Sequence, residues 1–494
     1  MMKRTLTLLL ALLMVFLACS LASCNKQADN PDADTTSPSN SSDNENDGSG
    51  DDYDLSRFDG IDLGDVTEVH ILSRGHERHR NEITCEDSSD EILHSIYVRQ
   101  LTIEEKLGIK LINDKVEETD EHGGRGELPV LVNSGDTTYS IYASSYYGSS
   151  NFAVSGLFTD LYDVPNLDTN RSYWSSYFTE KSQIGNSLYM ITGDAAISAT
   201  RFLFVTFFNK QLINDYGIED PFALVQNKEW TYDKMFSIVK DIYVDTNNNG
   251  EKDAEDTFGL GLNNYLGVDA YTSAFDLMCV RINEEKKAEL SVDVNKYSDA
   301  TNKLYTLFWQ TDGVLNKQDP DNLAKIFSEN RLVFSQSWLY NVESIEMRNM
   351  KNGYGIIPYP LYNSDQEDYY TFGHDQITIF AVPKTCVHTD AAGAVLELMA
   401  AASKSTVINQ YYEIALKYRY APDPTSSAML DLIRDNFLLD TGWVYCENLE
   451  LVSRMLRTLI ENKSNNFASY YAKYSESFEQ AIDKLNTDFG FPEG

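Results

Sequence analysis

The sequence predicts an α/β protein with more than one lobe, and three observations support this. The 494 residues exceed what one compact core normally accommodates, so two or three lobes are expected. Hydrophobic residues make up 42% of the chain and aromatic residues 12%, which is enough to fill such cores. Near the start, a β-rich stretch, a helical stretch and a second β-rich stretch follow one another, the order of a parallel crossover unit.

The first three elements follow from local patterns. Residues 67–73 alternate and are β-rich, so they are predicted as a strand. Residues 91–107 have helical apolar spacing, which Gly108 ends, and 109–112 form a second strand. Residues 140–148 are predicted as a third strand ending in a polar, aromatic loop. Open α/β sheets bind ligands at such strand ends.

The later elements continue the mixed pattern. Residues 230–244 form a helix with one apolar face and Thr231 as its N-cap. The tail from Ala391 is mostly helical. Further strands are expected at 187–192, 202–209, 258–262, 332–338, 353–360 and 377–382.

The N-terminus has the features of an export signal. Lys3 and Arg4 precede an apolar run over 6–18, which is shorter than the roughly 20 residues that a spanning helix needs. Residues 21–24, Leu-Ala-Ser-Cys, resemble the bacterial lipobox, which is cleaved before a lipidated cysteine. We therefore expect a signal peptide at 1–23, lipidation of Cys24 and an exported protein anchored to the outer face of the bacterial cell membrane. An ordinary secretory signal and an uncleaved anchor are the alternatives.

The segment after the signal is predicted to be a disordered acidic tether, residues 24–62. Much of it is rich in Asp, Asn, Ser and Pro, with almost no large apolar side chain. Such a composition buries too little surface to offset the entropy of ordering.

Charge and cysteine usage exclude two classes of function. The formal net charge of −36 repels phosphate backbones, so nucleic acid is not an expected partner. The later cysteines, Cys85, Cys279, Cys386 and Cys446, are far apart and have no CxxC spacing, so zinc binding has no support. Disulfide pairing among them stays open.

Seven segments carry recognisable short motifs in a fixed order: EEKLGIKL (104–111), NSGDTTYSIYA (133–143), GLFTDLYD (156–163), GNSLYMIT (185–192), FVTFFNKQLINDYGIEDP (204–221), EWTYDKM (229–235) and GYGIIPYP (353–360). In this order they resemble the family 1 extracellular solute-binding proteins of bacterial ABC importers. The loop SRGHERHR (73–80) departs from the family pattern because it is unusually charged and rich in histidine. A solvated basic loop is the preferred interpretation, and contact with an acidic sugar is the alternative.

The resemblance implies a periplasmic-binding-protein-like fold of two α/β lobes joined by hinge-crossing strands, with a mostly helical C-terminal part. Lobe 1 would comprise 63–202 plus 381–424, and lobe 2 would comprise 203–380 plus 425–494. Such a protein is not an enzyme. It captures a small-molecule solute, here expected to be a carbohydrate or oligosaccharide, by hinge closure and delivers it to the transmembrane subunits of an ABC permease.

Two other functions are open at this stage. A surface glycan-binding lipoprotein that feeds an outer-membrane transporter would be almost entirely helical. A secreted glycoside-processing enzyme would use a pair of carboxylates. Because the chain has 76 acidic residues, the presence of such pairs in the sequence does not indicate an enzyme. The chain contains no GxSxG, HExxH, P-loop or glycine-rich dinucleotide motif.

Candidate solute-binding residues lie near predicted strand ends. Sugars have apolar C–H faces and a rim of hydroxyl groups, so they need flat aromatic rings together with fixed polar groups. The candidates are Tyr142, Ser144, Tyr146, Asp194, Asn263, Trp338, Tyr340 and Asp375.

The stretch DTNNNGEKDAED, residues 245–256, has the oxygen spacing of an EF-hand calcium loop. Gly250 occupies the sixth position, where the turn is sharp. A single loop of this kind predicts a structural Ca²⁺ site, whereas an Asn- and Gly-rich turn is the alternative. The expected ligands are Asp245, Asn247, Asn249, Glu251, Asp253 and Asp256, with Glu251 contributing its carbonyl oxygen.

Overall fold

The computed structural model describes residues 52–263, 265–420 and 424–492. The predicted signal peptide, the lipidation site Cys24 and the first part of the predicted tether lie outside the described residues. The chain divides into two units, residues 1–47 and 48–494, and all that follows concerns the second unit.

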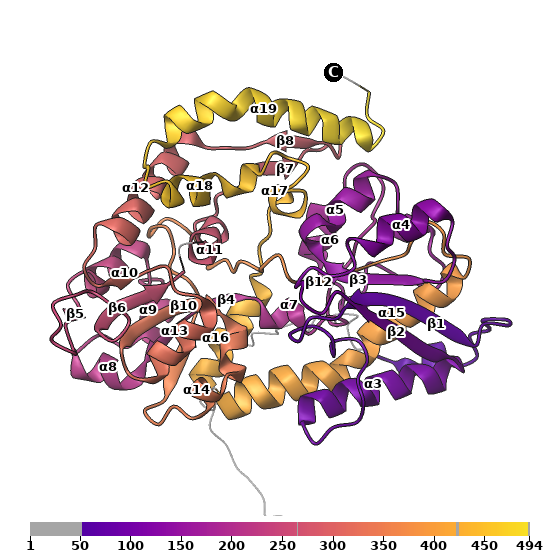
Figure 1. The fold of residues 1–494 in the computed structure, drawn as a ribbon, viewed down its shortest axis with the longest axis horizontal. Helices are drawn as coiled ribbons and strands as arrows, with labels where there is room; N and C mark the ends of the chain where they lie inside the picture. The colour runs from indigo at the N-terminus through magenta and orange to yellow at the C-terminus, as the bar shows by residue number, and fades with distance from the viewer. Residues whose placement is uncertain (1–51, 264, 421–423, 493–494) are drawn as a thin grey trace, which may run out of the picture. The chain divides into compact units, whose positions relative to one another are not determined.

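The first sheet contains three parallel strands and one antiparallel edge strand, in the order β12-β3-β1-β2 (Figure 1). The strands are β1 (Glu68–Arg74), β2 (Lys110–Val116), β3 (Ile141–Ser145) and β12 (Thr378–Ala381). β1 pairs in parallel with both β2 and β3, and β12 pairs antiparallel with β3. The carboxyl ends of the three parallel strands therefore share one edge of the sheet.

The predicted crossover unit is confirmed as β1-α3-β2, and its helix has the predicted bounds, Glu91–Leu107. The Asp90 side chain accepts hydrogen bonds from the N–H groups of Ile92 and Leu93, both at 3.0 Å. Gly108 ends the helix in the left-handed region, with φ 66°, which a residue without Cβ adopts at little cost.

The second sheet has the order β11-β4-β10-β6-β5, and β9 pairs with β6 outside this path. β6 and β10 are parallel, whereas β4 is antiparallel to both β10 and β11. A separate hairpin joins β7 to β8. The bounds are β4 (Phe204–Asn209), β5 (Tyr243–Val244), β6 (Thr257–Leu262), β7 (Val280–Ile282), β8 (Ala288–Leu290), β9 (Val314–Leu315), β10 (Leu332–Trp338) and β11 (Tyr354–Ile357).

One expected strand is wrong. Residues 187–192 make isolated bridges, such as Ile191 with Phe380, and no continuous ladder. The end of this stretch pairs instead with residues 174–175. Ser175 N–H donates to Thr192 O at 2.9 Å, and Trp174 forms a bridge with Gly193.

Helices cover both sheets and form most of the C-terminal part. The bounds are α4 (Glu127–Ser134), α5 (Tyr146–Val154), α6 (Ser176–Ser182), α7 (Ser198–Arg201), α8 (Lys210–Asp215), α9 (Pro221–Gln226), α10 (Tyr232–Val239), α11 (Leu266–Ala274), α12 (Val294–Trp309), α13 (Pro320–Ser328), α14 (Ile345–Arg348), α15 (Thr389–Ser403), α16 (Pro424–Asp435), α17 (Thr441–Val444), α18 (Met455–Glu461) and α19 (Phe467–Asp488). Shorter or irregular helices are η1 (Leu55–Phe58), η2 (Leu161–Asp163), η3 (Leu339–Glu343), the π-helical η4 (Lys404–Tyr420) and η5 (Val452–Arg454).

Two crossing segments join the sheets side by side. The first runs through α7 into β4, and the second returns to β12. Phe204 N–H donates to Phe372 O at 2.9 Å, and His374 N–H donates to Phe202 O at 3.0 Å. The mutual hydrogen bonds make the two crossings an antiparallel pair.

The helix from α15 into η4 combines a long span with an apolar composition. Over 389–417 its length and composition would suffice to cross a membrane, but 83% of its most apolar window is buried within the protein. In Figure 1 this orange segment runs beside α3. Its interior carboxylate, Glu397, accepts hydrogen bonds from Tyr173, Trp174 and Arg57. These features are those of a core helix.

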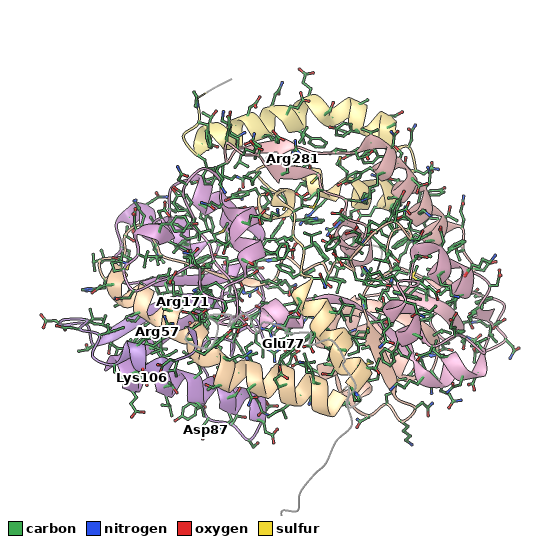
Figure 2. The ribbon with its side chains drawn as sticks, turned by 180° about the vertical axis from the view of Figure 1, so that it is seen from behind. Arg57, Glu77, Asp87, Lys106, Arg171 and Arg281 are labelled. Carbon is green, nitrogen blue, oxygen red and sulfur yellow. The ribbon has the colours of Figure 1, made fainter. Side chains whose placement is uncertain are left out.

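The end of the predicted tether differs from the expectation. Residues 52–62 are described and packed, with Phe58 only 2% exposed in the core. Arg171 Nη1 lies 2.7 Å from Asp52 Oδ1, and Arg57 Nη1 lies 3.3 Å from Glu397 Oε1; Figure 2 labels both arginines. The composition of 24–62 as a whole is polar, but its last residues include a few apolar side chains. These side chains supply enough buried surface to order this end of the segment.

The chain also returns to the first sheet slightly earlier than the expected lobe boundary at residue 381. β12 begins at Thr378 and pairs with β3 from its first residue, Thr378 opposite Ser145. The sequence predicts a strand over 377–382. It does not predict which sheet the strand joins, because that depends on pairing with residues far away in the chain.

Candidate functional site

Loops at the carboxyl ends of strands from both sheets contact one another. Arg78, in the loop after β1, has its guanidinium carbon 5.3 Å from the ring centroid of Trp338, the last residue of β10. Its Nη2 also lies 3.2 Å from Oδ2 of Asp321 in the first turn of α13. Parallel strand ends of the two sheets therefore face a common site, the position where α/β proteins bind ligands.

Five rings form an aromatic cluster at this site: His79, Phe202, Trp338, Tyr340 and His374. The Phe202 ring, on the first crossing, lies 5.1 Å from Trp338, 5.3 Å from His79 and 5.8 Å from Tyr340, centroid to centroid. Trp338 Nε1 donates to Asn341 Oδ1 at 2.7 Å, which fixes the indole. Four of the five rings are buried, and Tyr340 is the half-buried member of the cluster.

Two titratable groups lie beside or within the aromatic cluster: Arg74, which pairs with Glu82, and His79, which is uncharged. Arg74 is buried and donates to Gln376 O at 2.9 Å and Glu121 O at 3.0 Å. Burial lowers the pKa of Arg74 to about 10, against the opposing effect of Glu82. Burial also holds the pKa of His79 well below its usual value, so its imidazole is neutral at pH 7. The charged groups of this region that reach solvent are at its rim, on Arg78, Glu121 and Asp321.

A second group, the Tyr147 cluster, comprises His122, Arg125, Tyr147, Asp375 and Arg454. The guanidinium carbons of Arg125 and Arg454 lie 5.3 and 5.0 Å from the Tyr147 ring centroid. Arg454 Nη2 lies 3.4 Å from Asp375 Oδ2, and His122 Nδ1 lies 2.7 Å from Ser145 Oγ. Burial lowers the pKa of His122 to about 4, so this ring is also neutral at pH 7.

The structure brings together three of the predicted solute-binding residues. Trp338 and Tyr340 belong to the aromatic cluster, and Asp375 belongs to the Tyr147 cluster. His374 connects the two clusters, because its ring lies 5.4 Å from Trp338 and its Nδ1 lies 3.1 Å from Asp375 Oδ1. The two clusters are therefore in direct contact through His374.

Four other predicted residues have structural partners in this conformation. Tyr142 and Tyr146 are fully buried; Tyr142 packs on Phe158, and Tyr146 donates to Gly373 O at 3.1 Å. Ser144 Oγ donates to Gly123 O at 2.8 Å, and Asn263 Nδ2 donates to Gln318 O at 2.5 Å. Contact of these side chains with a solute stays a prediction.

Asp194 lies in a separate cavity of about 370 Å³. The cavity is lined by residues of 172–177, 192–203 and 434–437 together with Ile377 and Ile408, and by none of the other seven predicted solute-binding residues. Arg434 Nη2 lies 2.7 Å from Asp194 Oδ1, and burial raises the pKa of the Asp194 carboxyl. Phe202 belongs to the aromatic cluster, whereas the next residue, Leu203, lines this cavity.

Sequence reasoning did not select several members of the two clusters. The loop 73–80 stands out in the sequence by its charge and its histidines, and it contains both Arg78 and His79. Phe202, His122 and Arg454 carried no local signal, since each comes from a different part of the chain and gains its role only through packing.

The predicted calcium loop forms a compact turn. Asp245 accepts hydrogen bonds from the N–H groups of Asn249 at 3.2 Å and Gly250 at 3.0 Å, and Gly250 has φ 75°. Both carboxylate oxygens of Asp256 accept hydrogen bonds, from Thr246 N–H and Tyr243 O–H at 3.0 Å each. Within 52–263, 265–420 and 424–492, no group of three or more His, Cys, Asp or Glu side chains is positioned for a metal ion. Calcium binding stays a prediction.

Comparisons with known proteins define the fold. No family model and no curated protein matches the sequence. An ABC substrate-binding protein from Listeria monocytogenes, in complex with cycloalternan, is 13% identical, with 87% of this chain and 100% of that chain covered and a TM-score of 0.53. A solute-binding protein of an ABC transporter from Thermotoga lettingae, bound with α-D-tagatose, is 13% identical, with 84% and 100% covered and a TM-score of 0.55. A sugar transporter protein from Rhizobium etli in an open conformation is 13% identical, with 86% and 100% covered and a TM-score of 0.53. The predicted fold class, a periplasmic-binding-protein-like α/β fold, is confirmed.

Proposed function

We propose that this protein is an extracellular solute-binding lipoprotein of an ABC importer, which captures a carbohydrate between its two sheets and delivers it to the permease. The observation that carries the proposal is the contact between the aromatic cluster and the Tyr147 cluster, whose residues come from strand ends and loops of both sheets. Solved structures of the same fold hold sugars, as described for the Listeria and Thermotoga proteins.

The physical chemistry of the surface suits a carbohydrate. Micromolar affinity corresponds to about −8.2 kcal/mol. One or two stacked rings and several hydrogen bonds can supply this, and Tyr340, Tyr147 and Asp375 offer both kinds of contact. The paired crossing segments would act as the hinge. A solute that touches both sheets gains contacts only in the closed state, and it therefore favours closure.

Export and anchoring belong to the same proposal. The Leu-Ala-Ser-Cys sequence supports lipidation of Cys24 and a position on the outer face of the cell membrane. A Cys24→Ser variant should then lack the lipid mass on the mature chain and leave the membrane fraction. An unchanged mass and membrane fraction would reject the anchor without affecting solute binding.

The mixed α/β fold argues against the almost entirely helical glycan-binding alternative. A glycoside-processing enzyme remains the second candidate, and it differs in one observable. Steady release of product from oligosaccharides by the purified protein would replace the binding proposal with an enzymatic one.

A thermal-shift screen tests the proposal directly. Mono- and oligosaccharides are added to the purified mature protein, since a bound solute raises the melting temperature by mass action. Tyr340→Ala should weaken the best binder roughly tenfold, because about 1.4 kcal/mol of stacking is lost. Tyr216→Ala removes an exposed tyrosine outside the two clusters and serves as the matched control. A screen without any carbohydrate shift, or equal shifts in both variants, would contradict the proposal.

A further inference from the structure

Arg78 covers the indole of Trp338, the residue best suited to stack on a sugar. Trp338 is 2% exposed, and the Arg78 guanidinium lies above its ring at 5.3 Å. The rings of Phe202, Tyr340 and His374 meet the indole at steep angles of 63°, 83° and 85°. A solute that stacks on Trp338 must therefore displace a neighbour, and Arg78 belongs to a loop, whereas Phe202 and His374 are bonded into the crossing segments.

The surroundings of the Arg78 guanidinium are those of a cation site. Its Nη1 donates to Glu121 Oε1, and its Nη2 lies 3.2 Å from Asp321 Oδ2. An aromatic face and two carboxylates together attract a cation, through the ring quadrupole and through charge-assisted hydrogen bonds. Arg78 comes from the first sheet, whereas Asp321 and Trp338 belong to the second, so the cation site is complete only when the sheets face each other.

Two other cations near the aromatic cluster have carboxylate partners of their own. Arg201 makes a two-pronged pair with Glu343 at 2.8 and 3.0 Å, and Arg74 lies 3.6 Å from Glu82. When Arg78 leaves, Glu121 and Asp321 lose their cation. A neutral solute does not replace it, whereas a protonated amine does. The net charge of −36 also favours the approach of cations over anions.

We propose that Arg78 is an intramolecular occupant of the solute site, and that the solute carries a protonated amine that takes its place over Trp338 between Glu121 and Asp321. This inference rests on the proposed function and names its substrate class: an amino-sugar oligosaccharide. Arg78 then acts as a specificity-determining residue, because a solute without a basic nitrogen cannot compensate for its displacement.

A matched pair of probes tests the substrate class. The β1,4-linked glucosamine tetramer and its fully N-acetylated form share one backbone, and only the first carries protonated amines at pH 6. Titration calorimetry on the purified mature protein should give at least about tenfold tighter binding of the glucosamine tetramer. A combined Glu121→Gln and Asp321→Asn variant should reduce this preference to nearly one. Equal binding of the two tetramers, tighter binding of the acetylated form, or no binding of either would overturn the inference.

Variants of Arg78 test the occupancy itself. Arg78→Ala should bind the glucosamine tetramer about three- to tenfold more tightly, because the internal competitor is absent. Arg80→Ala removes the same charge from an exposed position of the same loop and should change nothing. Weaker binding by Arg78→Ala would instead make Arg78 a direct contact of the solute and overturn the inference.

The protein without solute gives an independent readout. Acrylamide quenching of tryptophan fluorescence should rise in Arg78→Ala but not in Arg80→Ala, and the increase should vanish when Trp338→Phe is added. No increase would show that Arg78 does not cover Trp338 in solution. Binding of neutral sugars without a preference for amines would overturn this inference and leave the proposed function intact. The absence of binding by every carbohydrate would reject the proposed function instead.

Discussion

Glu397 provides the sharpest test of how the helical tail joins the fold. Its carboxylate is buried in the middle of α15, where four donors reach it. Tyr173 O–H donates to Oε1, and Trp174 Nε1 donates to Oε2 at 3.3 Å. Arg57 Nη1 donates at 3.3 Å, and Asp168 N–H donates at 3.2 Å. The network joins α15 to η1 and to the 168–174 segment.

The expected cost of losing this carboxylate follows from its partners. Glu397→Ala leaves Arg57 without its buried carboxylate and three further donors without an acceptor. Removal of one member of a buried charged network costs about 3–5 kcal/mol of unfolding free energy. Glu397→Gln retains an acceptor oxygen of the same reach. Burial raises the pKa of Glu397, so removing its charge also relieves desolvation. We expect this variant to cost about 1–2 kcal/mol.

Urea unfolding followed by tryptophan fluorescence measures both variants under one condition. The ranking predicted is wild type above Glu397→Gln above Glu397→Ala. A loss below about 1 kcal/mol for Glu397→Ala would refute the reasoning, because a carboxylate with buried donors cannot be that dispensable. Such a result would mean that α15 is not packed as a core helix against these segments.

Two further predictions concern a titrating group and the acidic loop. Burial lowers the folded-state pKa of His122 from 6.5 to about 4, so between these values the unfolded chain binds more protons and stability falls as the pH falls. The loss from pH 6.5 to 4 is at most about 3 kcal/mol. Urea unfolding at several pH values should therefore show a shallower pH dependence in His122→Gln than in the wild type. An equal slope in wild type and His122→Gln would contradict the burial of a neutral ring. For the loop 245–256, millimolar Ca²⁺ should raise the melting temperature of the wild type and not of Asp245→Ala; no shift in the wild type would leave the loop as an Asx-rich turn.

Local chemistry allowed much of the fold to be predicted from the sequence. The bounds of α3 follow from a capping aspartate, Asp90, and a left-handed glycine, Gly108, which act within the segment itself. β10 follows from a continuous β-rich run, and its burial on all seven positions explains why that run shows no polar alternation. The stretch 187–192 was β-rich too, but a strand also needs a partner along its length, and the sequence does not show one.

The candidate site was less predictable because its members meet only through long-range packing. Trp338, Tyr340 and Asp375 lie near predicted strand ends, and the structure places them in two clusters that touch through His374. Tyr142 and Tyr146 have the same position in the pattern, but both are fully buried. In a chain with 31 tyrosines, whether a ring is buried or presented depends on the neighbouring elements. Arg454 comes from the helical tail, whose apolar spacing gave no indication that it reaches Tyr147.

A crystal structure of the protein with its tightest-binding carbohydrate tests the central claim most directly. The proposal predicts density for the sugar between the strand ends of the two sheets, in contact with Tyr340 and Asp375, and with Arg78 moved away from Trp338. Density in the cavity beside Asp194 and Arg434, or on an outer face of either sheet, would contradict it.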